Sequence, residues 1–500
     1  MRTWLDVAKA FAADRGVETY VHVLEAFVGP HPRGGPPPPE EIAWAGDFDA
    51  LERHRLADDL SAISTDLQEE VDEAQACMFE RRLRSVDLAL HELGDDAGRL
   101  LRVGLRQRLQ GILAAPRPRA LRVRALADFY YSYAGWHRHQ RAAIDPPSVA
   151  SLVAAARWER VGAGVDYALL SGPSECGPLH VNLLRVDPSR VRFVVRDCRE
   201  RAHAGEPFET LVHEHGAIAA VSGGFFLYSE PDIAPPSARH DPVGLLLDDA
   251  VVLSPPVFRR GGLFVDERGQ VSIGRVGMAD VDLRGPDGTS WPTDAIVNRA
   301  TAADAIGPDV ASAAIVGTQI VACGRSLPVP LNGFVVPLPN GAAMPEIGAP
   351  VRFAAVRGPT GPLVTGIAGG PMLLDGDAPC PQMRAEDFWG TAPPVTFSQD
   401  ETGDHNRLPR LAVGQRDDGQ LVFAAVDGRN FEHALGMTLA EVGALLRTLG
   451  CTRATNLDGG SSKRMVVDGR TRDLPTTEIV AGVAEDAPVR PVYTALLICQ

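Results

Sequence analysis

Residues 421–469 constrain the fold of this 500-residue chain more than any other stretch. Three short apolar runs within it predict strands, at residues 421–426, 453–457 and 464–467. Between the first two, Thr438 and Glu441 have capping-box spacing, apolar residues recur every three or four positions, and Gly450 supplies a stop, so one amphipathic helix is expected. The predicted order is therefore strand, helix, strand, glycine turn, strand, with an Asp-Gly turn at 468–469 closing the last strand.

An Asp-Gly-Gly turn at residues 458–460 follows the second of these strands. Glycines let a backbone approach a ligand more closely than any residue with a Cβ, so we expect the Asp458 carboxylate to face a cleft. The four residues that follow add hydroxyl donors and positive charge: Ser461, Ser462, Lys463 and Arg464. This mixture of a base, neutral donors and cations suits an anionic substrate. The alternative is a tight turn with solvated charges.

This segment resembles the signature of the phosphodiester glycosidase domain family, Asn-Leu-Asp-Gly-Gly-Gly-Ser-(Ser/Ala)-Thr-Met-Val. The chain keeps most of it, at Asn456, Leu457, Asp458, Gly459, Gly460, Ser462, Met465 and Val466. Ser461 stands in place of the third glycine, and Lys463 and Arg464 stand where small or hydroxyl residues are usual. Further segments match in the family's order, at residues 222–226, 329–335, 368–376, 410–414 and 426–429. The resemblance covers residues 158–500.

The resemblance implies a hydrolase that cleaves the glycosidic bond of a sugar 1-phosphodiester and releases the sugar and a phosphomonoester. Such a substrate carries a fixed negative charge, which suits arginine because the planar guanidinium binds two phosphate oxygens at once. Arg410 and Arg429 are the predicted clamp, with a surface salt bridge as the alternative for each. A glycosidase also needs a carboxylate to activate water or to attack the anomeric carbon. Asp458 is the first choice for this carboxylate and Asp427 the second.

Other residues near these turns are predicted to bind substrate. Gly223 and Gly224 follow a predicted strand at residues 217–222 and allow close backbone approach, while the Phe225 ring could floor a pocket. His405 precedes the arginine segment and could donate to a sugar hydroxyl or a phosphate. The full predicted substrate-binding set is Gly223, Gly224, Phe225, His405, Asn456, Gly459, Gly460, Ser461, Ser462 and Lys463.

Two other classes of function stay open. A metal-dependent phosphodiesterase would cleave the P–O bond, with Asp458, Asp427 and a histidine as metal ligands. A non-catalytic glycan-binding protein would keep an aromatic pocket and turn over no substrate. The glycosidase reaction requires no cofactor, so a divalent metal is expected only under the first alternative.

The spacing of apolar residues changes once along the chain. Amphipathic helical spacing fills most of residues 1–150, whereas short β-branched runs separated by Gly, Pro and Asp begin at Trp158. This change predicts a helical amino-terminal domain of unknown role at residues 1–150 and a catalytic domain at residues 158–500. The predicted fold class is α+β, with a mixed α/β catalytic domain after the helical one.

Composition and net charge limit the binding partners and the cellular compartment that we expect for this protein. The net charge of −15 disfavours nucleic acid and anionic membranes, so the expected partner is a small-molecule or glycan phosphodiester. The amino terminus lacks a signal-peptide core, no later stretch reaches about 18 apolar residues, and the 7 cysteines show no CxxC spacing. We therefore expect a cytoplasmic enzyme without a disulfide framework. A homo-oligomer is compatible with the sequence.

Overall fold

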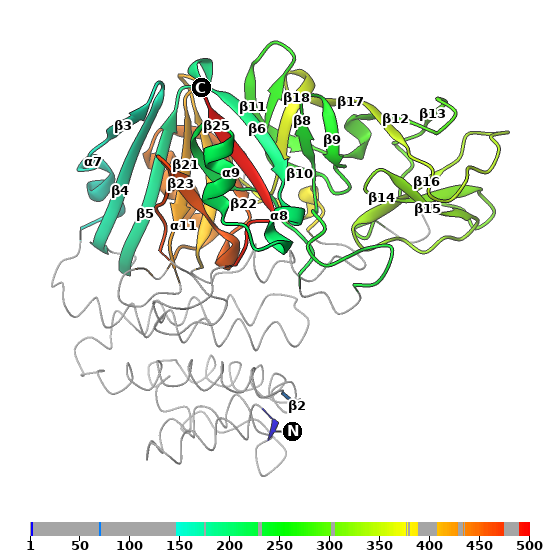
Figure 1. The fold of residues 1–500 in the computed structure, drawn as a ribbon, viewed down its shortest axis with the longest axis horizontal. Coiled ribbons are helices and arrows are strands. Elements are labelled where there is room, and N and C mark those ends of the chain that lie inside the picture. Colours follow the sequence, from blue (N-terminus) through cyan, green and yellow to red (C-terminus); the bar gives the residue numbers. More distant parts are fainter. Residues whose placement is uncertain are drawn as a thin grey trace.

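The computed structural model describes residues 2–3, 70–71, 147–174, 177–228, 233–301, 306–376, 378, 381–388, 408–428, 434, 436–474 and 490–500. Figure 1 shows this part as a series of sheets with a few short helices on their faces. All neighbouring strands in the two sheets that carry the site run antiparallel.

A seven-stranded sheet forms the first layer, in the order β19-β22-β20-β21-β5-β4-β3. Its strands are β3 (Glu159–Gly162), β4 (Val165–Ser174), β5 (Gly177–Val186), β19 (Met372–Asp375), β20 (Arg410–Arg416), β21 (Leu421–Val426) and β22 (Cys451–Leu457). Successive residues of a strand point to opposite faces. On one face, Ala412 and Ala454 share a core with Val442 of α11 (Leu439–Thr448), and α7 (Val149–Ala154) packs against the same core.

A five-stranded sheet forms the second layer, in the order β24-β23-β7-β25-β6. Its strands are β6 (Arg192–Asp197), β7 (Ala217–Ser222), β23 (Met465–Val467), β24 (Arg470–Thr471) and β25 (Thr494–Cys499). Val221 and Leu496 share a core with Leu411 and Phe423 of the first layer, so the two sheets pack face to face. Helices α8 (Arg199–His203) and α9 (Phe208–Glu214) cover the other face, where Leu211 is buried.

Two further sheets are formed between residues 246 and 368. The eight-stranded one contains β8 (Leu246–Asp248), β9 (Val251–Ser254), β10 (Arg260–Asp266), β11 (Val271–Val276), β12 (Val281–Arg284), β13 (Ser290–Trp291), β17 (Arg352–Gly358) and β18 (Gly361–Ala368). The three-stranded one, β14 (Ser312–Val316), β15 (Gln319–Gly324) and β16 (Gly333–Pro337), lies at the opposite end of the described part from β3 and β4 (Figure 1). Short 3-10 helices are η4 (Pro188–Arg190), η5 (Met278–Asp280), η6 (Met383–Glu386) and η7 (Gly460–Ser462).

The order predicted around the Asp-Gly-Gly turn is confirmed, since β21, α11, β22 and β23 follow one another as expected. The capping box forms: Thr438 N donates to Glu441 Oε2 at 2.9 Å, and Glu441 N donates to Thr438 Oγ1 at 3.2 Å. Gly450 has φ +86° directly after the last turn of the helix. Asp468 and Gly469 have φ of 52° and 68°, the geometry of a two-residue hairpin turn.

The predicted fold class, α+β with a helical amino-terminal domain, is wrong. The described part is mostly β-sheet, and the longest of its α-helices, α11, has 10 residues. Within the region expected to be helical, Arg2–Thr3 and Glu70–Val71 are strands β1 and β2, which pair antiparallel. Antiparallel strands can be joined by short turns and need no crossover helices, which explains why so little helix separates them. Most of the predicted helical domain, up to residue 146, lies outside the described residues.

The predicted boundary between residues 150 and 158 stays a prediction. The first strand of the seven-stranded sheet, β3, begins at Glu159. This is next to Trp158, where the spacing of apolar residues was predicted to change. Among the helices of the described part, none is long and apolar enough to cross a membrane.

Candidate active site

Three of the predicted site residues lie at one edge of the seven-stranded sheet. Leu411 of β20 pairs with Leu457 of β22, and Val426 of β21 pairs with Val181 of β5. Because neighbouring strands are antiparallel, β22 and β21 end at this edge and β20 begins there, while β5 starts four residues earlier, at Gly177. In strand order, the edge carries Asp458, Arg410, Asp427 and His180.

The Asp-Gly-Gly turn connects this edge to the five-stranded sheet. Asp458 N donates to Gly223 O at the end of β7 at 3.0 Å, and Gly460 N donates to Pro409 O at 2.9 Å. Gly460 has φ +61°, which glycine adopts without strain, and a Cβ on Gly459 would lie 2.7 Å from Pro409 O. Asp458 itself is half-buried and lies at the joint between the two sheets.

Asp427 is a fully buried carboxylate that accepts hydrogen bonds on both oxygens. Lys463 Nζ and Leu474 N lie 2.6 Å and 3.1 Å from Oδ1. His180 Nδ1 and Asn182 Nδ2 lie 2.6 Å and 3.2 Å from Oδ2. Protein donors, one of them an ammonium, thus occupy the positions that a metal ion would need in the phosphodiesterase alternative. The described residues contain no group of three or more His, Cys, Asp or Glu arranged to hold a metal ion.

Lys463 and Arg464, the two cations that depart from the family signature, are paired in the interior. Oδ2 of Asp473 lies 3.2 Å from Lys463 Nζ and 3.0 Å from Arg464 Nη1. Oδ1 of Asp473 accepts from Met465 N at 2.6 Å. Together with Asp427, two carboxylates face two cations in a cluster where the Lys463 side chain is 0% exposed. The contact of Lys463 with substrate stays a prediction, and in this structure its ammonium binds the two carboxylates.

The Arg410 side chain lies on the face of the seven-stranded sheet that packs against α11. Along β20, Leu411 faces the core between the two sheets, whereas Ala412 faces α11. Arg410 shares the side of Ala412, because its Nε donates to the Met437 carbonyl oxygen just before α11 at 3.1 Å. The residue is 3% exposed. Arg410 and Asp427 therefore start from opposite faces, and their side chains can approach each other only at the edge of the sheet.

The remaining polar residues of the turn are also buried. Asn456 Nδ2 donates to Gly370 O at 3.0 Å, whereas Asn456 Oδ1 accepts no hydrogen bond within the described part. Ser461 and Ser462 are 4% and 3% exposed, and Ser462 Oγ accepts from Arg490 Nη1 at 3.1 Å. Two predicted site residues, His405 and Arg429, lie outside the described residues.

Packing within the protein accounts for the glycines after β7. A Cβ on Gly224 would lie 2.3 Å from Ala368 O at the end of β18, and one on Gly223 would lie 2.5 Å from Ile367 Cδ1. Phe225 is 7% exposed and belongs to a core formed mainly by the eight- and three-stranded sheets. These residues hold β7 against β18, and their contact with substrate stays a prediction.

Replacing Gly224 by alanine should lower the free energy of unfolding by about 1–3 kcal/mol, because the new methyl group meets a backbone oxygen that cannot rotate away. Denaturant unfolding of the purified variant measures this. Gly307→Ala is a matched control, since its nearest neighbour, a methyl of Val310, would lie 3.6 Å away. An unchanged midpoint for the Gly224 variant would mean that β7 and β18 are farther apart than the structure shows.

Sequence reasoning missed His180, Asn182 and Asp473. A signal existed for the first two, because they alternate with Val181 in a mainly apolar strand and so place two polar side chains on a core-facing side. Tyr167 OH donates to Asn182 Oδ1 at 2.8 Å, and burial raises the pKa of this phenol above its ordinary value, so it stays protonated as a donor. Asp473 carries no local signal, because its importance comes from the cations it meets after folding.

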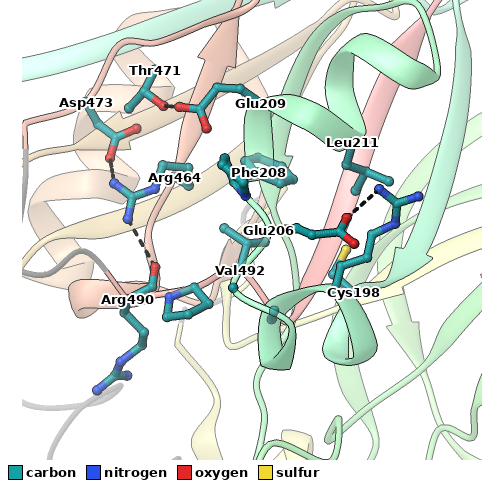
Figure 2. A pocket seen from close by; sticks show the side chains of 15 residues that line it. Cys198, Glu206, Phe208, Glu209, Leu211, Arg464, Thr471, Asp473, Arg490 and Val492 are labelled. Carbon is teal, nitrogen blue, oxygen red and sulfur yellow. Dashed lines mark hydrogen bonds and ion pairs between the residues drawn. The ribbon is translucent and has the colours of Figure 1, made fainter.

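A pocket of about 520 Å³ lies between the Arg464–Asp473 ion pair and the segment of α8 and α9 (Figure 2). Phe208 and Val492 supply apolar surface to it, and Arg464 Nη2 donates to the Arg490 carbonyl oxygen at 3.3 Å on its wall. The Arg464–Asp473 pair therefore belongs both to this pocket and to the buried charge cluster around Asp427.

Comparisons with known proteins add one family match and a few distant similarities. The family described as Phosphodiester glycosidase matches residues 215–499. The SPbeta prophage-derived uncharacterized protein YomE of Bacillus subtilis (strain 168) is 44% identical over 62 residues, which are 12% of this chain and 10% of that protein. The chain thus covers about a tenth of the length of this curated relative.

Similar solved structures are distant. A hypothetical protein from Synechocystis is 19% identical with a TM-score of 0.43, and the match covers 69% of this chain and 63% of that one. The catalytic domain of zebrafish N-acetylglucosamine-1-phosphodiester alpha-N-acetylglucosaminidase, auto-inhibited by its pro-peptide, is 14% identical with a TM-score of 0.41, and the match covers 72% of this chain and 93% of that one. Neither is close enough to bear on the site of this chain.

Proposed function

The chain belongs to the phosphodiester glycosidase family, and from this we propose that it hydrolyses the glycosidic bond of a sugar 1-phosphodiester to give the sugar and a phosphomonoester. The observation that carries the proposal is the placement of Asp458. Asp458 is half-buried at the joint between the two sheets, and its backbone N–H donates to Gly223 O. A second carboxylate, Asp427, is held on the same edge by Lys463.

The two carboxylates suit different tasks. Glycosidic cleavage passes through an oxocarbenium-like transition state, whose positive charge requires a nearby carboxylate. Asp458 takes this role in our proposal, either by stabilising that charge or by attacking the anomeric carbon, because it is the less buried of the two residues. Asp427 is fully buried and bonded on both oxygens, so it orients its neighbours. The phosphate leaves as a stable anion, so a cationic contact matters more than a strong acid.

Hydrolysis in isotopically labelled water tests the proposal. Purified protein is incubated with a panel of sugar 1-phosphodiesters, including nucleoside diphosphate sugars, and the products are analysed by mass spectrometry. We expect the label in the released sugar. Label in the phosphate would mean P–O cleavage and a phosphodiesterase. If the wild-type protein binds glycan but turns over substrate no faster than the Asp458→Asn variant, the protein is a glycan-binding protein without catalytic activity.

Replacing Arg410 by lysine should lower kcat/KM by about 10- to 100-fold, since a lost hydrogen bond to a charged group costs about 1.5–3 kcal/mol. Lysine keeps the charge but cannot bind two phosphate oxygens in the planar geometry of a guanidinium. Steady-state kinetics on the best phosphodiester of the panel measure the loss.

Arg416→Lys is the matched control, because it lies at the far end of the same strand and pairs with Asp418. It should retain nearly full kcat/KM. Near-normal kinetics in the Arg410 variant would end the assignment of this residue as the phosphate clamp.

A further inference from the structure

We propose that His180 is the base that takes the proton from the attacking water, with its imidazole oriented by Asp427. This inference rests on the proposed glycosidase activity and adds a residue that neither sequence pattern nor family motif assigned. His180 lies near the start of β5, and its Nδ1 is 2.6 Å from Asp427 Oδ2.

The partner on Nδ1 decides which ring nitrogen can act as a base. An ionised carboxylate only accepts hydrogen bonds, so the imidazole proton must lie on Nδ1, and the lone pair is left on Nε2. Lys463 Nζ lies 2.6 Å from the other oxygen of Asp427 and already supplies a positive charge. A neutral imidazole is therefore sufficient for this contact, and a neutral imidazole is the form that accepts a proton.

The position of the Asp427 carboxylate is fixed from a second side. Asn182, two residues along the same face of β5, donates from Nδ2 to Asp427 Oδ2 at 3.2 Å and accepts from Tyr167 OH at 2.8 Å. Within the part of the chain that the structure describes, Asp427 contacts His180, Lys463 contacts Asp427, and Tyr167 is linked to Asp427 through Asn182. Lys463 and Asn182 hold the carboxylate, and the carboxylate holds the ring.

Asp427 and His180 differ in how far their side chains are exposed to solvent. The Asp427 side chain is 0% exposed, whereas the His180 side chain is 14% exposed. Of the two side chains, the imidazole is therefore the one that can reach solvent. This arrangement makes Asp427 a positioning residue and His180 the group that exchanges protons.

The proposed step balances without any further reactant. The oxygen of water forms a bond to the anomeric carbon, and the bond from that carbon to the departing oxygen breaks, leaving its electron pair on that oxygen. The proton of the water passes to His180 Nε2, and the imidazolium then returns it to solvent. Asp458 stabilises the positive charge on the sugar during this exchange.

Replacing His180 by alanine should lower kcat by about 100- to 10,000-fold, the range for losing a general base, with little change in KM. Azide is an anionic nucleophile that needs no deprotonation, so it should accelerate the variant and yield a glycosyl azide in place of the free sugar. His180→Gln should be equally slow and equally rescued while keeping an amide donor toward Asp427. His213→Ala, at an exposed residue of α9, is the control and should behave as wild type.

Each outcome decides one question. A glutamine variant with wild-type kcat overturns the role of His180. Slow variants that azide does not accelerate mean that the loss is structural, which also overturns it. If the wild-type protein itself releases no sugar from any member of the panel, the glycosidase proposal fails, and the role of His180 falls with it.

Discussion

Replacing Asp458 by asparagine should lower kcat by about a hundredfold or more while the unfolding temperature stays nearly constant. Asparagine preserves the shape of the side chain and removes the negative charge that the transition state needs. The backbone hydrogen bond from residue 458 to Gly223 O does not depend on the side chain. Thermal unfolding and steady-state kinetics on the same sample separate an effect on chemistry from an effect on folding.

Asp468→Asn is the matched control for this substitution. Asp468 is an exposed turn residue with φ +52°, a conformation that asparagine also tolerates, so both rate and stability should be retained. The assignment of Asp458 fails if its variant unfolds at a markedly lower temperature yet keeps its rate per folded molecule. In that case Asp458 stabilises the turn and takes no part in the reaction.

Replacing Lys463 by methionine should destabilise the protein by about 3–5 kcal/mol, because it leaves buried carboxylates without one of their cations. Lys463 is 0% exposed and contacts both Asp427 and Asp473. Methionine nearly preserves the volume of the side chain, so the loss reports mainly the charge. Chemical denaturation measures the change in the free energy of unfolding.

A second substitution makes this prediction specific to charge. Lys463→Met combined with Asp427→Asn removes one charge of each sign and should recover part of the lost stability, as expected for coupled residues. Arg470→Met, at an exposed residue of β24, should be nearly neutral. If Lys463→Met is as stable as wild type, the contacts of Lys463 with the two carboxylates do not stabilise the fold, and the orientation argument for His180 loses its support from Lys463.

Local signals in the sequence predicted the local structure well. The capping box at Thr438 and the glycine stop at Gly450 placed α11 correctly, because each acts within a few residues. The runs on either side gave β21, β22 and β23 for the same reason. The family resemblance, carried by the Asp458 turn, is confirmed by the family match over residues 215–499.

Long-range partners could not be predicted from such signals. His180 and Asp427 are 247 residues apart in the chain, and no pattern near either one indicates the other. The positive charges at Lys463 and Arg464 suggested an anionic substrate, but the structure pairs them with Asp427 and Asp473. The prediction of the fold class was wrong for the same reason. The spacing of apolar residues reports a local period, whereas these sheets are built from strands that are distant in the sequence.

The position of β7 has a consequence for how the protein is made. In the described part, β7 is hydrogen-bonded to β23 and β25 only, and both are synthesised long after it. Between Ser222 and Met465 a ribosome needs about 10–50 s at about 5–20 residues per second. Throughout that time an apolar strand on the nascent chain has neither of its edge partners and is exposed to wrong pairing. Yield of active protein should therefore depend on translation speed and on chaperones that shield β7 until β23 and β25 emerge.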